Sequence, residues 1–258
     1  MHKPSNKPIP DAARLGNPSF VWRSGQERRL KIMQQHVKIK DKIILDLGCG
    51  LGEYVRAFSR EGGIAIGCDI ESSRVFEANQ RSIHHENSRT TFLVAEGEML
   101  PFLDNSLDIV VMNEVIEHVN NDHTTLREIS RVLRNEGSCI IFAPNKLFPF
   151  ETHGIYIGKK YIFGNIPFIN WLPRFIRNKL VPHARVYGHQ DWSQLILNTD
   201  LQIIEHTYVY PGFDNLEKKL GILGRMIRKI CYRAEKNWFR RFGLSHFLIL
   251  EKISKRNS

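Results

Sequence analysis

The sequence has no long hydrophobic run. None of its 258 residues belongs to an uninterrupted apolar stretch that approaches the roughly eighteen residues needed to span a membrane. The first residues, Met1–Pro4, lead into polar sequence and not into the apolar core of a signal peptide. We therefore expect a cytoplasmic protein, either free in solution or attached peripherally to the inner face of a membrane.

Cysteine is also scarce. The chain has four cysteines, Cys49, Cys68, Cys139 and Cys231. No two of them have the C-x-x-C spacing of a zinc or redox site, which favours a reducing compartment. Other metal-ligand patterns are weak, because Glu151 with His153, or His84 with His85, supplies only two ligands. We predict no metal site.

Positive charge is concentrated in the second half of the chain. Residues 1–150 contain nineteen basic and nineteen acidic residues, so the whole net charge of +10 arises in 151–258. Two segments there combine basic residues with aromatic or aliphatic ones, at 155–185 and 216–241. A surface of this kind can bind an anionic membrane or a nucleic acid.

One short stretch is the most informative part of the sequence. Ile43–Leu47 has the composition of a strand buried on both faces, and a glycine-rich turn follows it at Gly48, Gly50 and Gly52. Glycines let the backbone turn sharply and approach a ligand closely. The G-x-G-x-G spacing, with Asp46 before it, differs from the G-x-G-x-x-G of dinucleotide sites. It favours a different adenosine cofactor.

Two further acidic residues follow predicted strands. The strand Ile64–Ile70 contains Asp69 near its end, and Asp69 is suited to accept hydrogen bonds from ribose hydroxyls. Farther along, Phe92–Ala95 precedes Glu96, which could accept a hydrogen bond from an adenine amino group. The order of strand, loop, helix, strand and acid is the one expected for a nucleotide site.

Five ordered segments between about residues 40 and 145 resemble the class I S-adenosylmethionine-dependent methyltransferases, and in particular their type 11 group. The segments are 46–52, Asp69, 96–102, 104–119 and 126–138. The resemblance implies S-adenosylmethionine as the cofactor. It implies cofactor contacts at Asp46, Gly48, Gly50, Gly52, Asp69, Ile70, Glu96, Gly97, Glu98 and Asn113. The family usually has aspartate where this chain has Glu96.

The resemblance also implies the fold. We expect an α/β, doubly wound, seven-stranded and mostly parallel sheet with helices on both faces, its last two strands forming an antiparallel hairpin at one edge. One domain should occupy 21–258, after a poorly ordered segment at 1–20. Apolar residues at helical spacing predict a helix over Gly25–Val37, which we expect to cover the cofactor.

Methyl transfer to a hydroxyl group requires that hydroxyl to lose a proton. The candidate bases are His118, in the loop after the fourth strand, and His153 or Glu151, in the loop after the fifth. We prefer His153, because its loop contains Pro149 and Gly154 and follows the strand where the family places acceptor contacts. Each could instead be an ordinary solvated side chain.

The two basic segments have different predicted roles. We expect 147–187 to be a substrate-covering insertion, either a lid or a loop that dips into a membrane. Within 213–242 we expect a basic amphipathic helix, which could lie on an anionic membrane or pack its apolar side on its own domain. The prediction is O-methylation of an apolar or membrane-associated small molecule, such as a quinone, a lipid or a polyprenyl-linked glycan precursor. The alternatives are methylation of RNA or another polyanion, and a cofactor-binding protein without catalysis.

Overall fold

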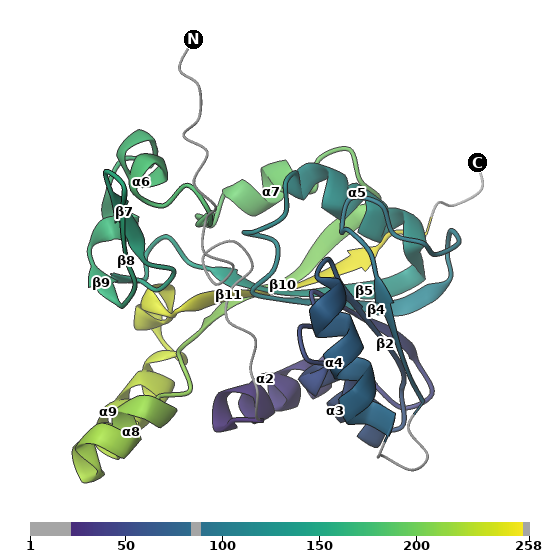
Figure 1. Cartoon of the computed structure of the whole chain (residues 1–258), viewed down its shortest axis with the longest axis horizontal. Coiled ribbons are helices and arrows are strands. Elements are labelled where there is room, and N and C mark those ends of the chain that lie inside the picture. Colours follow the sequence, from purple (N-terminus) through teal and green to yellow (C-terminus); the bar gives the residue numbers. More distant parts are fainter. Residues whose placement is uncertain (1–21, 84–88, 255–258) are drawn as a thin grey trace.

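A seven-stranded sheet forms the centre of the computed structural model, which describes residues 22–83 and 89–254 (Figure 1). Its strands lie in the order β10-β11-β5-β4-β1-β2-β3. Their bounds are β1 Ile43–Leu47, β2 Ile64–Asp69, β3 Thr90–Val94, β4 Leu107–Asn113, β5 Leu133–Pro144, β10 Leu201–Val209 and β11 Ser245–Lys252. The prediction of a seven-stranded, mostly parallel α/β sheet is confirmed.

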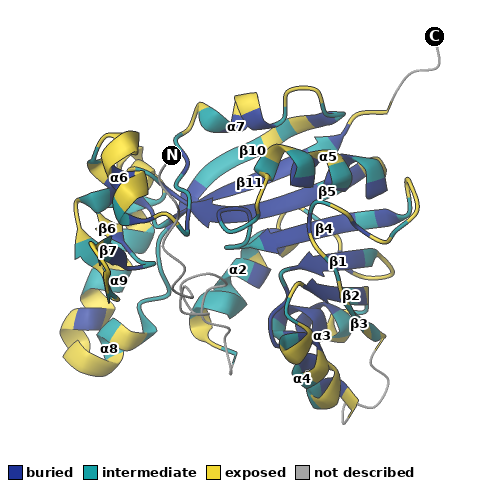
Figure 2. Cartoon of the chain, turned by 45° about the horizontal axis from the view of Figure 1, so that its top comes forward, coloured by how far each residue is buried: buried dark blue, intermediate teal, exposed yellow. Residues whose placement is uncertain are grey.

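The central strands are buried on both faces because apolar residues alternate between two cores (Figure 2). In β1, Leu45 and Leu47 join one core and Ile44 joins the other. Each such side chain, when fully buried, contributes roughly 1.5–3 kcal/mol to stability. A strand of this kind needs helices on both sides, which explains its nearly continuous apolar sequence.

Helices cover both faces of the sheet (Figure 1). Leu30 and Met33 of α2 (Ser24–Gln34) and Phe58 of α3 (Glu53–Arg60) pack into one core. Leu126 of α5 (Asp122–Val132) and Trp192 of α7 (Asp191–Leu195) pack into the other. Helix α4 (Ser72–Ile83) lies beside β2 and β3. Helix α2 is the predicted helix, shorter at its end than the expected Gly25–Val37.

The last two strands pair as predicted but do not form a simple hairpin. They run antiparallel from Leu201 opposite Lys252 to Val209 opposite Ser245. Strand β11 also pairs antiparallel with β5, so it lies inside the sheet and β10 takes the edge. Almost all of β11 is buried, which fits the inner position. The connection between the two strands holds α8 (Asp214–Leu220), α9 (Ile222–Ala234) and the 3-10 helix η2 (Trp238–Phe242).

The predicted insertion after β5 is present and has its own small core of Ile155, Val181 and Ala184. It is built from two short antiparallel strand pairs and two short helices. These are β6 (Phe150–Glu151) with β9 (Ile166–Pro167), β7 (Ile155–Ile157) with β8 (Lys160–Ile162), η1 (Ile169–Trp171) and α6 (Arg174–Leu180). A buried ion pair joins its two ends, with Arg177 Nη2 2.6 Å from Glu151 Oε2.

The predicted amphipathic helix is divided into several short helices. Gly221, with φ +54°, ends α8 and begins α9. The predicted apolar side does not pack as a whole on the domain, since Leu223, Met226, Ile230 and Trp238 are between 55% and 61% exposed. The alternative in which this side packs inward is therefore wrong for these four residues. These side chains are exposed because α9 has few neighbouring elements apart from α8 and η2.

Among the helices in residues 22–83 and 89–254, none combines the length and apolar character needed to cross a bilayer. The predictions for the segment 1–20 and for His84 and His85 fall outside the described residues.

Candidate active site

The glycine turn after β1 is held by backbone hydrogen bonds. Gly48 and Cys49 both donate their N–H groups to the carbonyl oxygen of Cys68, at 2.7 and 2.9 Å. Gly48 has φ +73°, and a Cβ atom added there would lie 2.4 Å from the side chain of Val115. The position therefore requires glycine for both its backbone angle and its packing.

Asp69 fixes the other side of this turn. Its Oδ2 atom accepts the Gly50 N–H at 2.9 Å, and its Oδ1 atom accepts the Glu71 N–H at 3.0 Å. The carboxylate is buried and its orientation is set, while each oxygen keeps a lone pair for a further donor. Ile70, the next residue, is exposed. This arrangement suits a carboxylate that receives ribose hydroxyls.

Asp46 is the buried acid at the end of β1, and it lines a cavity beside the glycine turn. Burial, together with the nearby charge of Asp69, raises the pKa of Asp46 to about 8. Its carboxylate would be stabilised by a positive group in the cavity.

The residues predicted to contact adenine lie outside the lining of this cavity. Glu96 is exposed, and its carbonyl accepts the Met99 N–H at 3.2 Å in a tight turn. Gly97 is buried against Thr125. Glu98 accepts the backbone N–H of Asn121 at 2.9 Å, so its carboxylate is fixed to the start of α5. Their cofactor contacts stay predictions.

The cavity beside the glycine turn has a volume of about 470 Å³ and lies at the ends of β1 and β4. Of the predicted cofactor residues, four line it: Asp46, Gly48, Gly50 and Asn113. Two of the predicted bases, His118 and His153, line it as well. Helix α2 and the insertion close further sides, the latter through Thr152 and Phe163. The fold thus joins the glycine turn and the predicted catalytic loops in one space.

Arg29 of α2 lies in the wall of the cavity, and sequence analysis did not identify it as a site residue. It donates to the side-chain oxygen of Asn113, to Glu114 Oε1 at 2.6 Å and to Ser245 Oγ at 2.9 Å. Although burial raises the pKa of Glu114, Arg29 and Ser245 outweigh that effect and lower it below its usual value. These bonds hold α2 over the carboxyl end of β4.

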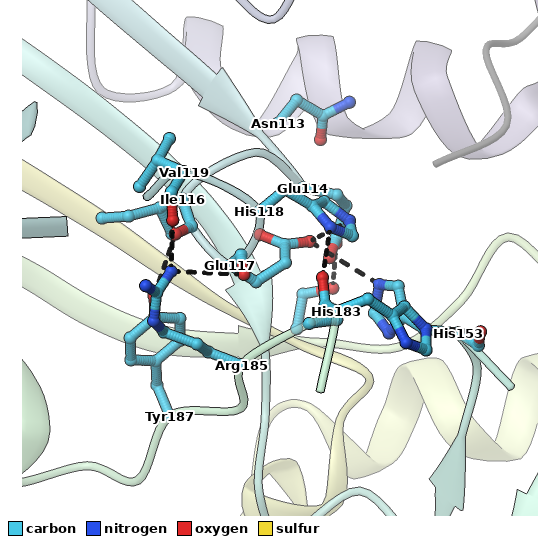
Figure 3. A network of polar contacts seen from close by, with 12 residues as sticks. Asn113, Glu114, Ile116, Glu117, His118, Val119, His153, His183, Arg185 and Tyr187 are labelled. Carbon is cyan, nitrogen blue, oxygen red and sulfur yellow. Dashed lines mark hydrogen bonds and ion pairs between the residues drawn. The ribbon is translucent and has the colours of Figure 1, made fainter. Parts of the chain in front are cut away.

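Glu117, His118 and His153 meet beside the cavity (Figure 3). The Nε2 atoms of His118 and His153 lie 3.9 and 3.8 Å from Glu117 Oε1. Mainly because of burial, the pKa of His118 is lowered. Burial also lowers the pKa of His153, but the carboxylates of Glu117 and Glu151 outweigh it and raise that pKa to about 10. With no other cation present, His153 would carry a proton, and His118 is then the better acceptor.

Glu151 is held in place rather than free to react. Its Oε1 atom accepts the backbone N–H of His153 at 2.8 Å and faces His153 Nδ1 at 2.9 Å. Its Oε2 atom accepts from Arg177 at 2.6 Å. Burial raises the pKa of Glu151, but His153 and Arg177 lower it overall to about 2. A carboxylate bound in this way is a weak base and orients His153 instead.

The end of the insertion fixes the loop that contains Glu117, another contact that sequence reasoning missed (Figure 3). Arg185 donates its backbone N–H to the Glu117 carbonyl at 3.1 Å and its guanidinium to the Val119 carbonyl at 2.6 Å. The hydroxyl of Tyr187 donates to the Ile116 carbonyl at 3.0 Å. No local sequence pattern indicates these contacts, which join residues more than sixty positions apart.

A family model described as a methyltransferase domain, of type 11, matches residues 45–141. A crystal structure of an S-adenosylmethionine-dependent methyltransferase from Mesorhizobium loti has the same fold, with a TM-score of 0.61 at 12% identity over 89% of this chain and 98% of that one. Residues 45–141 of the chain therefore match a methyltransferase domain, and the chain has the fold of S-adenosylmethionine-dependent methyltransferases.

Curated relatives resemble the chain over only part of their length. An uncharacterized methyltransferase of Mycobacteroides abscessus is 33% identical over 54% of this chain and 52% of its own. A ubiquinone biosynthesis O-methyltransferase of Coxiella burnetii is 25% identical over 54% of this chain and 58% of its own. The chain thus matches about half the length of these relatives. The family match ends before the insertion and before the helices of 213–242.

Proposed function

We propose that this methyltransferase transfers a methyl group from S-adenosylmethionine to a hydroxyl oxygen of an apolar or membrane-associated small molecule. The observation that carries the proposal is the shared cavity. It is lined at one side by Asp46 and the glycine turn and at another by His118, His153 and the aromatic insertion. A concave site in which a few polar groups converge is typical of small-molecule sites.

The residues of the first side fit the cofactor. Asp46 offers a buried carboxylate to a positive group such as the ammonium of the cofactor's methionine end. Gly48 and Gly50 leave room for a ligand against the backbone, and Asp69 keeps lone pairs for ribose hydroxyls. When bound, S-adenosylmethionine supplies a methyl group that is already activated, so the chain needs mainly to align the acceptor and exclude water.

The acceptor class is supported by the polar groups at the other side of the cavity and by the relatives. His118 can receive the proton of a hydroxyl, and His153 can bind that hydroxyl. The relative from Coxiella burnetii is named as a ubiquinone biosynthesis O-methyltransferase. A quinone, a lipid or a polyprenyl-linked glycan precursor would all offer a hydroxyl group on an apolar molecule.

Two exposed groups of residues support an acceptor that comes from an anionic membrane. We call them together the apolar-basic surface. Its apolar residues, between 48% and 69% exposed, are Phe163, Phe168, Trp171, Phe175, Ile222, Leu223, Met226, Ile230, Trp238 and Phe239. Its basic residues, also exposed, are Lys159, Lys160, Arg174, Lys179, Arg225, Lys229, Arg233, Lys236, Arg240 and Arg241. The insertion and the α8–α9 helices lie at the same end of the molecule (Figures 1 and 2).

The combination of charges and apolar side chains favours a membrane over the alternatives. Each Lys or Arg near an anionic bilayer contributes about 1 kcal/mol, and apolar side chains insert beside them. We therefore propose a cytoplasmic protein that attaches to the inner membrane face while its acceptor enters under the insertion. RNA, the other polyanion, would use the same charges but would gain less from exposed isoleucine, leucine and methionine.

Cofactor binding is the first test. Calorimetric titration with S-adenosylhomocysteine should show micromolar binding that is lost in Asp69→Ala. Transfer of labelled methyl groups to lipid, small-molecule and RNA fractions then identifies the acceptor class. Label in the lipid or apolar small-molecule fraction supports the proposal, and label in RNA alone overturns it. Cofactor binding without transfer to any fraction would favour a cofactor-binding protein without catalysis.

Vesicle flotation tests the membrane step separately. The protein should float with vesicles that mix phosphatidylcholine and phosphatidylglycerol and should stay behind with phosphatidylcholine alone. Trp238→Ser and Met226→Ser should weaken flotation, while Phe76→Ser should not, since that exposed side chain lies on α4. Absence of flotation, together with RNA binding that falls steeply with salt, would refute the membrane proposal.

A further inference from the structure

We propose that Glu117, His118 and His153 bind one divalent transition-metal cation at the wall of the cavity (Figure 3). This site departs from the prediction of no metal. No spacing of ligands in the sequence indicates it, because Glu117 and His118 are adjacent while His153 lies on the insertion. Only the packing of the insertion against the loop after β4 brings the three together.

Glu117 is the decisive residue. Its side chain has no exposed surface, and neither carboxylate oxygen has a hydrogen-bond partner in the described parts of the chain. The nearest ring nitrogens, at 3.8 and 3.9 Å, are too far for hydrogen bonds. A buried carboxylate with no donor is costly, and the cost is removed when a cation binds. The surrounding structure thus holds a buried carboxylate without a hydrogen-bond donor among the described residues, and its nearest charged neighbour, His153, is 3.8 Å away.

The two histidines are oriented as metal ligands usually are. His118 Nδ1 faces the carbonyl oxygen of His183 at 3.1 Å, so that nitrogen carries the proton. His153 Nδ1 faces Glu151 Oε1 at 2.9 Å, and Arg177 keeps Glu151 ionised. In both neutral rings the lone pair is then on Nε2, the atom nearer to Glu117. A metal-bound histidine typically donates its other ring N–H to a carbonyl or a carboxylate in this way.

The spacing of the three ligand atoms fits a first-row metal. All three lie within 4.8 Å of one another. Given the separations of 3.8 and 3.9 Å and the limit of 4.8 Å on the third, a point in their plane lies no more than about 2.5 Å from each, and a contraction of at most a few tenths of an ångström gives the usual zinc distances of about 2.0–2.2 Å. Two imidazoles and one carboxylate are ligands for zinc, iron or nickel rather than for magnesium or calcium.

Three protein ligands leave a coordination position open, as in catalytic zinc sites. Because His118 and His153 line the cavity, that position would be reached from the acceptor side. A hydroxyl oxygen bound there would be more acidic, and its proton would pass to water. This role rests on the proposed function, and it makes His118 and His153 ligands in place of bases. The binding site itself does not depend on methyl transfer.

Metal binding can be measured without an activity assay. The untagged full chain, stripped with a chelator, should bind one equivalent of Zn²⁺ by calorimetry, and Co²⁺ should give visible absorption bands of a site with nitrogen and oxygen ligands. Glu117→Gln keeps the shape of the side chain and should weaken Zn²⁺ binding by about 100-fold or more. His118→Gln should do the same, while His123→Gln, an exposed histidine on α5, should bind as the wild type does.

Thermal unfolding separates a metal ligand from a structural residue. Zn²⁺ should raise the melting temperature of the wild type and leave that of Glu117→Gln unchanged, although the stripped variant should be at least as stable as the stripped wild type. Sub-stoichiometric binding, or equal binding by Glu117→Gln, overturns the inference. Binding of S-adenosylhomocysteine is measured on the same samples. Binding of Zn²⁺ without binding of S-adenosylhomocysteine would refute only the proposed function. Binding of S-adenosylhomocysteine without binding of Zn²⁺ would refute only the metal site.

Discussion

The affinity for the cofactor should depend on pH through Asp46. Burial and Asp69 raise the pKa of this carboxyl group to about 8, so the cavity without a ligand holds it mostly protonated at neutral pH. A positive group in the cavity favours the carboxylate, and binding therefore has to expel a proton below pH 8. The ionised fraction is about one half at pH 8 and about 1% at pH 6, so binding should be roughly 50-fold weaker at pH 6, or about 2.3 kcal/mol.

Calorimetry with S-adenosylhomocysteine at pH 6, 7 and 8 measures the slope of affinity against pH directly. Repeating the titration in buffers of different ionisation enthalpy gives the number of protons released. Asp46→Asn should bind more weakly than the wild type at pH 8 and should lose most of the slope. The argument is refuted if the wild type binds equally at all three pH values. It is also refuted if Asp46→Asn keeps the full slope, because another group would then be responsible.

Three further predictions concern folding and stability. Gly48→Ala should abolish S-adenosylhomocysteine binding and lower the melting temperature, because its new Cβ would clash, whereas Gly188→Ala has room and should change neither. Arg177→Met removes the cation that pairs with the buried Glu151 Oε2 and should cost about 3–5 kcal/mol in urea unfolding, against less than about 1 kcal/mol for the exposed Arg174→Met. Burial lowers the pKa of His246 to about 4, so the wild type should lose up to about 3 kcal/mol as the pH falls from 6.5 to 4, and His246→Gln should lose less.

The sign of the His246 effect follows from its surroundings. Its Nε2 atom donates to the carbonyl oxygen of Tyr187 at 2.8 Å, and its Nδ1 atom accepts from His206 at 2.9 Å, which requires a neutral ring. The unfolded chain binds a proton near pH 6.5 while the folded chain resists it, so stability present above pH 6.5 is lost as the pH falls. Chemical unfolding of both proteins at pH 7 and pH 5 measures the difference.

The parts of the site made by adjacent residues could be predicted from the sequence. The strand Ile43–Leu47 had to be buried on both faces, and the glycines after it had to form a turn, because both properties depend on neighbouring residues. Asp69 follows from the same local pattern at the end of the next strand. The seven-stranded, mostly parallel sheet with its antiparallel pair came from the resemblance to a family, and the strand order, with β11 inside the sheet, needed the structure.

The contacts between distant segments could not be predicted in this way. Arg29 reaches Glu114 across eighty-five positions, and Arg177 reaches Glu151 across twenty-six. A sequence pattern shows that such residues are charged, but it does not show which opposite charge lies nearest after folding. The exposed side of α9 is a similar case, since its amphipathic pattern fits a packed helix and an open one equally well.

The sequence by itself determined the buried strand Ile43–Leu47, the glycine turn after it and the acid at the end of the next strand, because backbone turns and strand burial are encoded by local spacing. Tertiary structure alone decided which side chains lie across the cavity from the glycine turn. Glu117, His118 and His153 come from two loops, and their chemistry depends on separations of 3.8 and 3.9 Å that only the docked insertion sets. Buried charges respond to every neighbour within a few ångströms, and those neighbours are chosen by packing.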